Sequence, residues 1–244
     1  DEGMWEPYQM EYLKKELRAS GYRGNVSNVS DLFKHPMNAI VSLGGCSAAF
    51  VSDTGLIATN YHCIERSYLQ FNSNAESDLF ETGFVARTKE DEKKSAPGSR
   101  VYVTLDSSNI TDKVLFGLSD TTQALDRAKI IEDNKKEIIK NCETSDEIEC
   151  RVRSFFSGEI YKLEKVLKIK DVRLVYAPPA YIGEYGGEID NWMYPRHTGD
   201  FALLRAYTAK DGSSKEFNKD NVPYKSDSFL KISAKGVEDG DFVM

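Results

Sequence analysis

The chain has 244 residues, a net charge of −7 and 29% charged residues, a size that fits one large domain or two small ones. Its hydrophobic content of 40% is enough to bury a core, and an acidic balance without a long block of like charge argues against binding to nucleic acid. No apolar run approaches the roughly eighteen residues of a membrane span. The opening DEGMWEPYQM is not a signal peptide, although a mature N-terminus left by signal cleavage would look the same.

The first predicted elements along the chain are helical, and strands follow them. Residues 7–20 carry apolar residues at helical spacing, which predicts a short amphipathic helix, and we expect a second short helix to begin at residues 30–33. From residue 39 onward, three short apolar segments are separated by glycine or Asp-Thr-Gly: AIVSLGG, CSAAFVS and GLIATNYH. They predict consecutive strands joined by tight turns, and the β pattern continues in RVYVTLDSSNITDKVL.

The second half of the chain begins with the clearest helix. Residues 121–141 place Ala124, Ala128, Ile131 and Ile138 in one apolar stripe with charge opposite. A second helix is predicted from the pattern of residues 146–156. Strands are predicted after it, at 159–169, 171–177 and 201–209 and in a short run around Ile232. The final GDFVM reads as a turn followed by the start of a strand, so we expect the chain to be a piece of a longer polypeptide.

The four cysteines fall into two local pairs, Cys46 with Cys63 and Cys142 with Cys150. Neither pair has the CxxC spacing of a structural zinc site. An even number of cysteines in local pairs suits two disulfides and an oxidising compartment. Four buried free thiols in a cytosolic protein are the alternative.

His62, in the stretch TNYHC, has three possible roles: a catalytic base, a metal ligand or a structural histidine. The predicted strand GLIAT leads to a turn at His62, and a Cys46–Cys63 bond would hold that turn against the preceding strand. A fixed backbone suits a residue that must transfer protons in one place. The local pattern does not decide among the three roles.

A second candidate region is GEYGGEIDNWMYPRHTGDF at residues 183–201, whose glycines would make it costly to order as a simple linker. Asp200 lies at its junction with a strand, where it could accept the Nδ1 proton of a histidine or cap a turn. A metal site made by His62, His197 and Asp200 is possible but lacks HExxH spacing. His35, before a proline in a polar turn, is expected to be an exposed loop histidine.

With these segments in view, the chain resembles the N-terminal half of the S46 family of bacterial dipeptidyl peptidases, the dipeptidyl peptidase 7 and 11 group. The matching stretches include SLGGCSAAFVSDTGLIATNYHC, APGSRVYVT, KDVRLVYAPP and above all GGEIDNWMYPRHTGDFALLRAY. The last is long and unusual, so it is specific. TNYHC alone would be weak, because trypsin-like proteases carry a comparable Ala-His-Cys.

The resemblance implies a mainly β fold with helical additions: a chymotrypsin-like double β-barrel with a large inserted helical domain. Residues 1–244 would be the N-terminal part of the catalytic domain, with a helical excursion at about 119–156, and the rest of the barrel and the helical domain would lie outside the chain. The family's triad has the order His, Asp, Ser. His62 would be the general base and Asp200 its orienting carboxylate.

The nucleophilic serine is expected outside this chain, because no GxSGSP-like segment occurs in it and Ser157-Gly158 does not match one. The resemblance also implies that Asn191 and Trp192 bind the free α-amino group of the substrate. Many family members have a second histidine where this chain has Tyr61, which leaves the triad intact but changes its surroundings.

The resemblance therefore predicts a serine exopeptidase that releases dipeptides from oligopeptides with a free N-terminus. The resemblance also implies a homodimer. We expect no cofactor, no nucleic-acid partner and no membrane span, and a periplasmic, secreted or cell-surface location. Because the serine is missing, we expect the chain by itself to be inactive. Hydrophobic and acidic preferences at the residue before the cleaved bond both remain open, with a lean toward the hydrophobic one. Two other functions are considered: a non-catalytic peptide-binding module, and a metal-dependent hydrolase that uses His62, His197 and Asp200.

Overall fold

The computed structural model describes residues 5–187 and 197–243 of the chain. Contacts divide the chain into two compact units. Unit 1 comprises Asp1–Arg100 and Lys170–Met244, and unit 2 comprises Val101–Ile169. Both units are made of antiparallel strands with added helices, so the expectation of a mainly β fold with helical additions is confirmed at that level.

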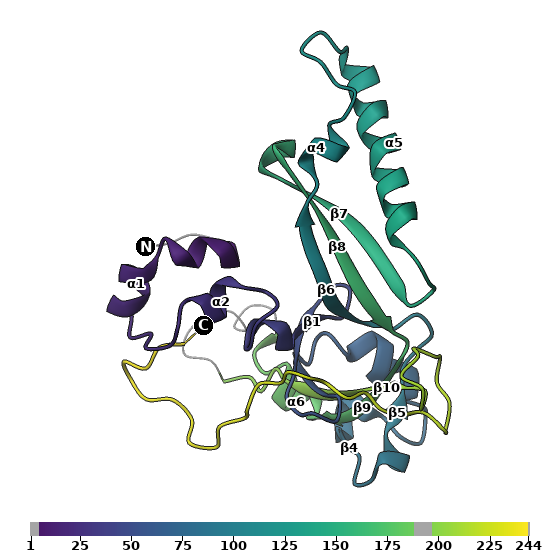
Figure 1. Cartoon of the computed structure of the whole chain (residues 1–244). Helices are drawn as coiled ribbons and strands as arrows, with labels where there is room; N and C mark the ends of the chain where they lie inside the picture. The colour runs from purple at the N-terminus through teal and green to yellow at the C-terminus, as the bar shows by residue number, and fades with distance from the viewer. Residues whose placement is uncertain (1–4, 188–196, 244) are drawn as a thin grey trace. The chain divides into compact units, whose positions relative to one another are not determined.

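Unit 1 is built on an antiparallel sheet whose strands follow the order β4-β9-β10-β3-β2-β1, with β5 added to β9 and β11 added to β10 (Figure 1). The strands predicted in AIVSLGG, CSAAFVS and GLIATNYH and at 171–177 and 201–209 are all present. Buried Phe50, Ile57, Leu174 and Leu204 make the sheet a core element. The strand bounds are β1 Ile40–Ser42, β2 Ser47–Phe50, β3 Leu56–Thr59, β4 Phe84–Val85, β5 Lys93–Lys94, β9 Asp171–Ala177, β10 Ala202–Thr208 and β11 Val222–Pro223.

The helices of unit 1 are all short. Residues 7–20 form a 3₁₀ turn and a separate α-helix instead of one helix, and the helix expected to begin at Ser30 in fact ends there. The stretch around Ile232 is not a strand, and neither are residues 240–243. The bounds are η1 Pro7–Glu11, α1 Lys14–Ala19, α2 Ser27–Ser30, η2 Met37–Ala39, η3 Glu65–Gln70, α3 Leu79–Thr82, η4 Lys89–Asp91 and α6 Ala180–Gly183.

Unit 2 is a three-stranded antiparallel sheet in the order β6-β8-β7, with a long helix beside it (Figure 1). Its elements are β6 Val101–Asn109, α4 Thr111–Val114, α5 Ala124–Cys142, β7 Ile148–Phe155, η5 Phe156–Gly158 and β8 Ile160–Ile169. The predicted helix at 121–141 is confirmed as α5. Asn134 of α5 donates hydrogen bonds of 2.9 Å to the carbonyl oxygens of Val114 and Phe116, and Ile131 and Ile138 pack on a buried cluster around Val114.

The helix predicted at residues 146–156 is wrong, because this segment is the strand β7. Its whole length pairs with β8, from Ile148 opposite Leu167 to Phe155 opposite Ile160. Cross-strand side-chain contacts favour the strand: Arg153 forms an ion pair with Glu164 at 3.2 Å. The helical excursion expected at about 119–156 is therefore limited to α5 and is followed by a β-hairpin.

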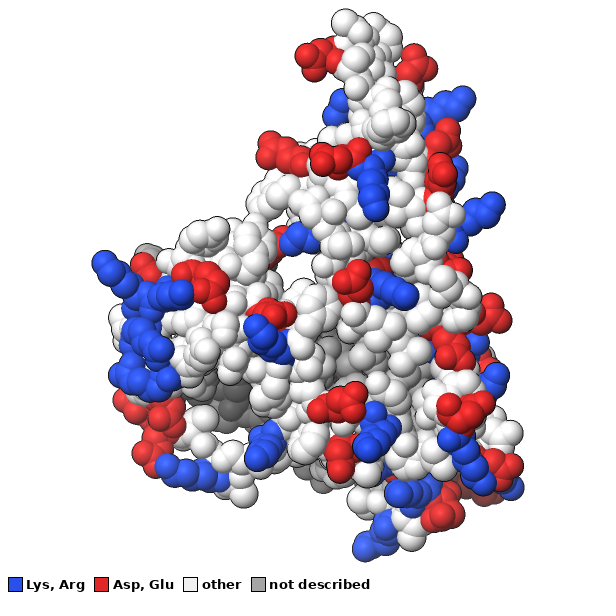
Figure 2. All heavy atoms as spheres, viewed as in Figure 1, with Lys and Arg blue, Asp and Glu red and all other residues white. Residues whose placement is uncertain are grey.

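Two disulfides are formed, Cys46–Cys63 in unit 1 and Cys142–Cys150 in unit 2. On the face shown in Figure 2, basic and acidic side chains are interspersed, as expected for a chain with 32 lysines and arginines and 39 aspartates and glutamates. None of the helices in the described ranges is long and apolar enough to cross a membrane.

Candidate active site

The pairing of β3 with β10 brings the two candidate regions together. These strands are antiparallel neighbours, and Thr59 lies opposite Ala202. Continuing that register two residues past the end of β3 places Tyr61 opposite Asp200 (59 + 2 and 202 − 2). The turn that carries His62 therefore meets the start of β10, although the two segments are 138 residues apart in sequence.

His62 and Asp200 are in direct contact. The Nδ1 atom of the His62 ring lies 2.9 Å from Oδ2 of Asp200. The His62 side chain is 56% exposed, whereas that of Asp200 is only 11% exposed. A mostly buried carboxylate at Nδ1 favours the tautomer whose proton is on Nδ1, so that Nε2 is free to accept a proton from another group.

The Asp200 carboxylate is held from several sides. Its Oδ1 accepts hydrogen bonds from the backbone N–H groups of Tyr61, at 2.7 Å, and of His62, at 3.3 Å. Its Oδ2 also accepts from the Asn60 side-chain amide at 3.1 Å. These contacts orient the carboxylate before any substrate arrives, which is the preorganisation that an electrostatic role requires. The two backbone hydrogen bonds also mean that Asp200 caps the histidine turn, which was the second role predicted for it from the sequence.

Tyr61 is the residue that fixes the base of the histidine turn. It is fully buried, and its ring lies directly against Gly183 of α6, where an added Cβ would be 2.5 Å from a ring carbon. The Tyr61 hydroxyl has no hydrogen-bond partner among the described residues. Burial and the nearby Glu184, Glu65 and Asp78 raise the pKa of Tyr61 to about 12, so the ring is neutral.

A pair of carboxyl groups lies beside this turn. Glu65 follows His62 at the start of η3, and its side chain is hydrogen-bonded to that of Glu184. Burial raises the pKa of Glu65 to about 7, helped by the hydrogen bond and by repulsion from Glu184 and Asp200. Near neutral pH Glu65 is therefore partly protonated and can donate a hydrogen bond to the Glu184 side chain.

The Glu65 proton links stability to pH. The pKa of Glu65 is raised from 4.5 to about 7, so its contribution to stability is complete below pH 4.5 and is lost as the pH rises through 7. We expect the free energy of unfolding to decrease between pH 5 and pH 8 by about 1 kcal/mol less in Glu65→Gln than in the unsubstituted protein. This difference is smaller than the full pKa shift implies, because the Glu65 side chain is partly exposed to solvent. Urea unfolding at the two pH values measures this. An unchanged pH dependence in Glu65→Gln, or an equal change in exposed Glu76→Gln, would contradict it.

The metal site proposed from His62, His197 and Asp200 is not supported by the arrangement of side chains. In residues 5–187 and 197–243, the only three-residue group with metal-binding side chains close together is Cys46, His62 and Cys63. Both cysteines are bonded to each other, and a disulfide offers no thiolate. His197 instead lies with its ring 6.3 Å from the ring of Tyr185, centre to centre.

The remaining sequence candidates are placed as follows. His35 is exposed, as expected, and its Nδ1 lies 3.0 Å from the Ser228 hydroxyl. Ser157 lies in η5, at the turn between β7 and β8 in unit 2. Asn191 and Trp192 are outside the described residues.

Sequence reasoning missed Asn60 and Glu65, and it placed Gly183 and Glu184 in a candidate region without giving either of them a role. Asn60 could have been found from its position next to the histidine turn, whereas the contacts of Glu65, Gly183 and Glu184 depend on α6 lying against that turn.

Comparison with known proteins identifies the family. The model of the family described as peptidase S46 matches residues 1–244, which is the whole chain. The chain belongs to the S46 peptidase family. Its curated S46 relatives include an "Asp/Glu-specific dipeptidyl-peptidase" of Shewanella putrefaciens, 46% identical over 243 residues, and "Dipeptidyl-peptidase 7" of Porphyromonas gingivalis, 37% identical over 249 residues. All of this chain aligns with 33% of the first relative and 34% of the second.

Solved S46 structures share the fold. A crystal structure of DPP11 from Porphyromonas endodontalis in an alternate conformation matches with a TM-score of 0.85 and 30% identity, covering 99% of this chain and 37% of that one. The same protein in complex with substrate matches with a TM-score of 0.83 and 29% identity, covering 99% and 36%. The chain thus spans about a third of the length of the S46 proteins it matches.

Proposed function

We propose that this chain forms part of a serine peptidase that releases dipeptides from the N-terminus of oligopeptides. His62 is the general base: its Nε2 takes the proton of a serine hydroxyl as the serine attacks the second peptide carbonyl, and then protonates the leaving amine. Asp200 orients the imidazole and stabilises its protonated form. The serine and the oxyanion hole belong to a part of the protein outside this chain.

One observation carries the proposal: the contact of 2.9 Å between Nδ1 of His62 and Oδ2 of Asp200. The same carboxylate is bound by two backbone N–H groups of the histidine turn. This pattern is what a base–orienter pair needs, because it leaves the exposed Nε2 edge available for a nucleophile. A structural histidine has no need of a fixed acid on one nitrogen and an open second nitrogen.

For the substrate, we propose a free α-ammonium group bound by Asn191 and Trp192, and an acidic residue before the cleaved bond. The Asn side-chain oxygen and the Trp ring face would provide two kinds of contact for a cation. This acidic preference replaces the hydrophobic residue that the sequence analysis favoured before the cleaved bond. It rests on the name of the Shewanella putrefaciens relative, which is 46% identical to this chain.

The two other functions have less support. A non-catalytic binding module would not require the oriented histidine. A metal-dependent hydrolase would require His197 near His62 and Asp200, and the described residues place no such group together. We further propose that the sheet of unit 1 belongs to a chymotrypsin-like barrel, and that the complete protein is a homodimer located in the periplasm, outside the cell or at its surface.

The test uses the full-length protein and peptides that differ only at the N-terminus or at the second residue. We expect release of N-terminal dipeptides from peptides with Glu or Asp as second residue, and no release from the same peptides after N-acetylation. A serine-directed phosphonate should abolish the activity, and a chelator should not. Internal cleavage of the acetylated peptides, or loss of activity with the chelator alone, would refute the proposal.

A further inference from the structure

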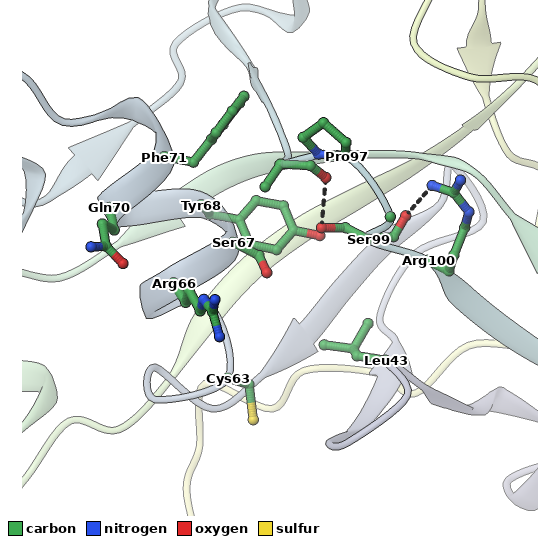
Figure 3. A pocket seen from close by; sticks show the side chains of 12 residues that line it. Leu43, Cys63, Arg66, Ser67, Tyr68, Gln70, Phe71, Pro97, Ser99 and Arg100 are labelled. Carbon is green, nitrogen blue, oxygen red and sulfur yellow. Dashed lines mark hydrogen bonds between the residues drawn. The ribbon is translucent and has the colours of Figure 1, made fainter.

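A pocket of about 650 Å³ lies within unit 1, next to the histidine turn. Its wall is made by Leu43, by residues of the segment 63–71 and by the segment 96–100 (Figure 3). This volume is typical of pockets that hold a small organic molecule or a few residues of a peptide. The pocket is separate from the Asp200 side of the dyad, because neither His62 nor Asp200 is among its lining residues.

The pocket lies next to the candidate dyad of His62 and Asp200 along the chain. Cys63, the neighbour of His62, lines it. A nitrogen of the His62 ring and the sulfur atoms of Cys46 and Cys63 all lie within 4.8 Å of one another. The Cys46–Cys63 disulfide therefore forms a short bridge between the imidazole and the pocket. A peptide whose cleaved bond is at His62 can reach the pocket with its next residues.

The lengths of the two sides of the substrate indicate which of them enters the pocket. The dipeptide side is only two residues long and, in the proposed function, its amino end is bound by Asn191 and Trp192. The leaving side, by contrast, extends for as many residues as the substrate has. Resting on the proposed function, we infer that this pocket binds the first residues of the leaving peptide and that Arg66 binds a carboxylate group in them.

The chemistry of the wall explains the choice of a carboxylate. Leu43, Phe71 and Pro97 provide apolar surface, and Phe71 is 41% exposed. Figure 3 shows Arg66 between Tyr68 and Cys63. Arg66 forms no ion pair with any residue that the structure describes, and no acidic residue lines the pocket. An arginine without a partner beside an apolar wall suits a carboxylate, which it can bind with two parallel hydrogen bonds.

The second arginine of the pocket is already engaged. Arg100 forms an ion pair with Glu216 at 2.6 Å and donates a hydrogen bond of 2.7 Å to the Ser99 carbonyl oxygen. Its charge is therefore compensated within unit 1. Within the part of the chain that the structure describes, Arg66 is therefore the lining cation without a carboxylate partner.

The test compares peptides that share the N-terminal dipeptide and the leaving residues. One ends in a free carboxylate, one in a C-terminal amide, and one in an amide with a glutamate among its leaving residues. In the full-length protein, we expect kcat/KM to be about threefold to fivefold higher for a peptide with a carboxylate than for the neutral amide, the range of an exposed ion pair. If only the peptide with the free C-terminus is cleaved faster, the pocket binds a chain end. If the peptide with the glutamate is cleaved faster, the pocket binds an acidic side chain. The preference should weaken at high salt.

Arg66→Gln should bring the ratio of kcat/KM between acid and amide close to one, whereas Arg87→Gln, at an exposed arginine outside the pocket, should preserve it. The ratio is internal to each variant, so a general loss of folded protein does not change it. A preference that survives in Arg66→Gln, or that is absent in the unsubstituted protein, would overturn the leaving-side site alone. If the unsubstituted protein releases no dipeptide from any of the three peptides, the proposed function itself fails.

Discussion

Asp200→Asn should lower kcat of the full-length protein by about 10³–10⁴-fold while the protein remains folded, as expected for the loss of an orienting carboxylate. In the structure, Oδ1 of Asp200 accepts the two backbone N–H groups of the turn and Oδ2 contacts Nδ1 of His62. The asparagine would keep its oxygen on the backbone groups and present its NH₂ group to His62. That group donates a hydrogen bond, so it selects the tautomer with its proton on Nε2, which cannot act as a base.

The control for this prediction is Asp78→Asn. Asp78 caps α3 by accepting a hydrogen bond from the Phe80 N–H at 2.9 Å, and it does not contact His62. Asn is as good a cap as Asp, so kcat should stay within about threefold of the unsubstituted value. Steady-state kinetics, with circular dichroism to verify folding, measure both variants. Activity of Asp200→Asn within tenfold of the unsubstituted protein would show that His62 does not depend on this carboxylate.

Gly183→Ala should destabilise the protein by about 1–3 kcal/mol, the usual cost of forcing an extra methyl group into a packed interior. The added Cβ would lie 2.5 to 2.8 Å from three carbons of the Tyr61 ring, and Tyr61 has no exposed surface through which to move away. Because the Tyr61 N–H binds Asp200, displacement of the ring also disturbs the dyad. We therefore expect kcat to fall by about tenfold or more, since small displacements of reacting groups cost that much.

Gly45→Ala is the matched control, because a Cβ at Gly45 meets nothing within 4 Å. Its free energy of unfolding should change by less than about 0.5 kcal/mol, as for other surface substitutions. Chemical denaturation and dipeptide release measure the two glycine variants. Equal stability of Gly183→Ala and Gly45→Ala would contradict the close packing of Tyr61 on α6.

The sequence predicted the strands of unit 1 well because their apolar residues alternate and glycines mark the turns between them. The same reasoning failed at residues 146–156. An eleven-residue amphipathic segment can be helical or extended, and β7 is extended because β8 provides a partner along its whole length. The prediction of a strand around Ile232 was wrong for the opposite reason. This stretch has the composition of a strand, but it pairs with no neighbouring strand in the described residues.

The candidate site was predictable only where one local motif carried the chemistry. TNYHC and HTGDF each suggested a function, and the family resemblance joined His62 to Asp200. No motif links Glu65 to Glu184, and they are 119 residues apart (184 − 65). Only the packing of α6 against the histidine turn reveals that their side chains are hydrogen-bonded.

By itself, the sequence determined the mainly β class, the two cysteine pairs, the membership of a family and the identity of the candidate base and its carboxylate. These properties depend on local patterns and on short, unusual motifs. The tertiary structure decided the rest: the register that places Asp200 at Tyr61, the burial of Tyr61 against Gly183 and the pocket beside the Cys46–Cys63 disulfide. Each of these results from side chains distant in sequence that meet only when the chain is folded, and no local pattern encodes such a meeting.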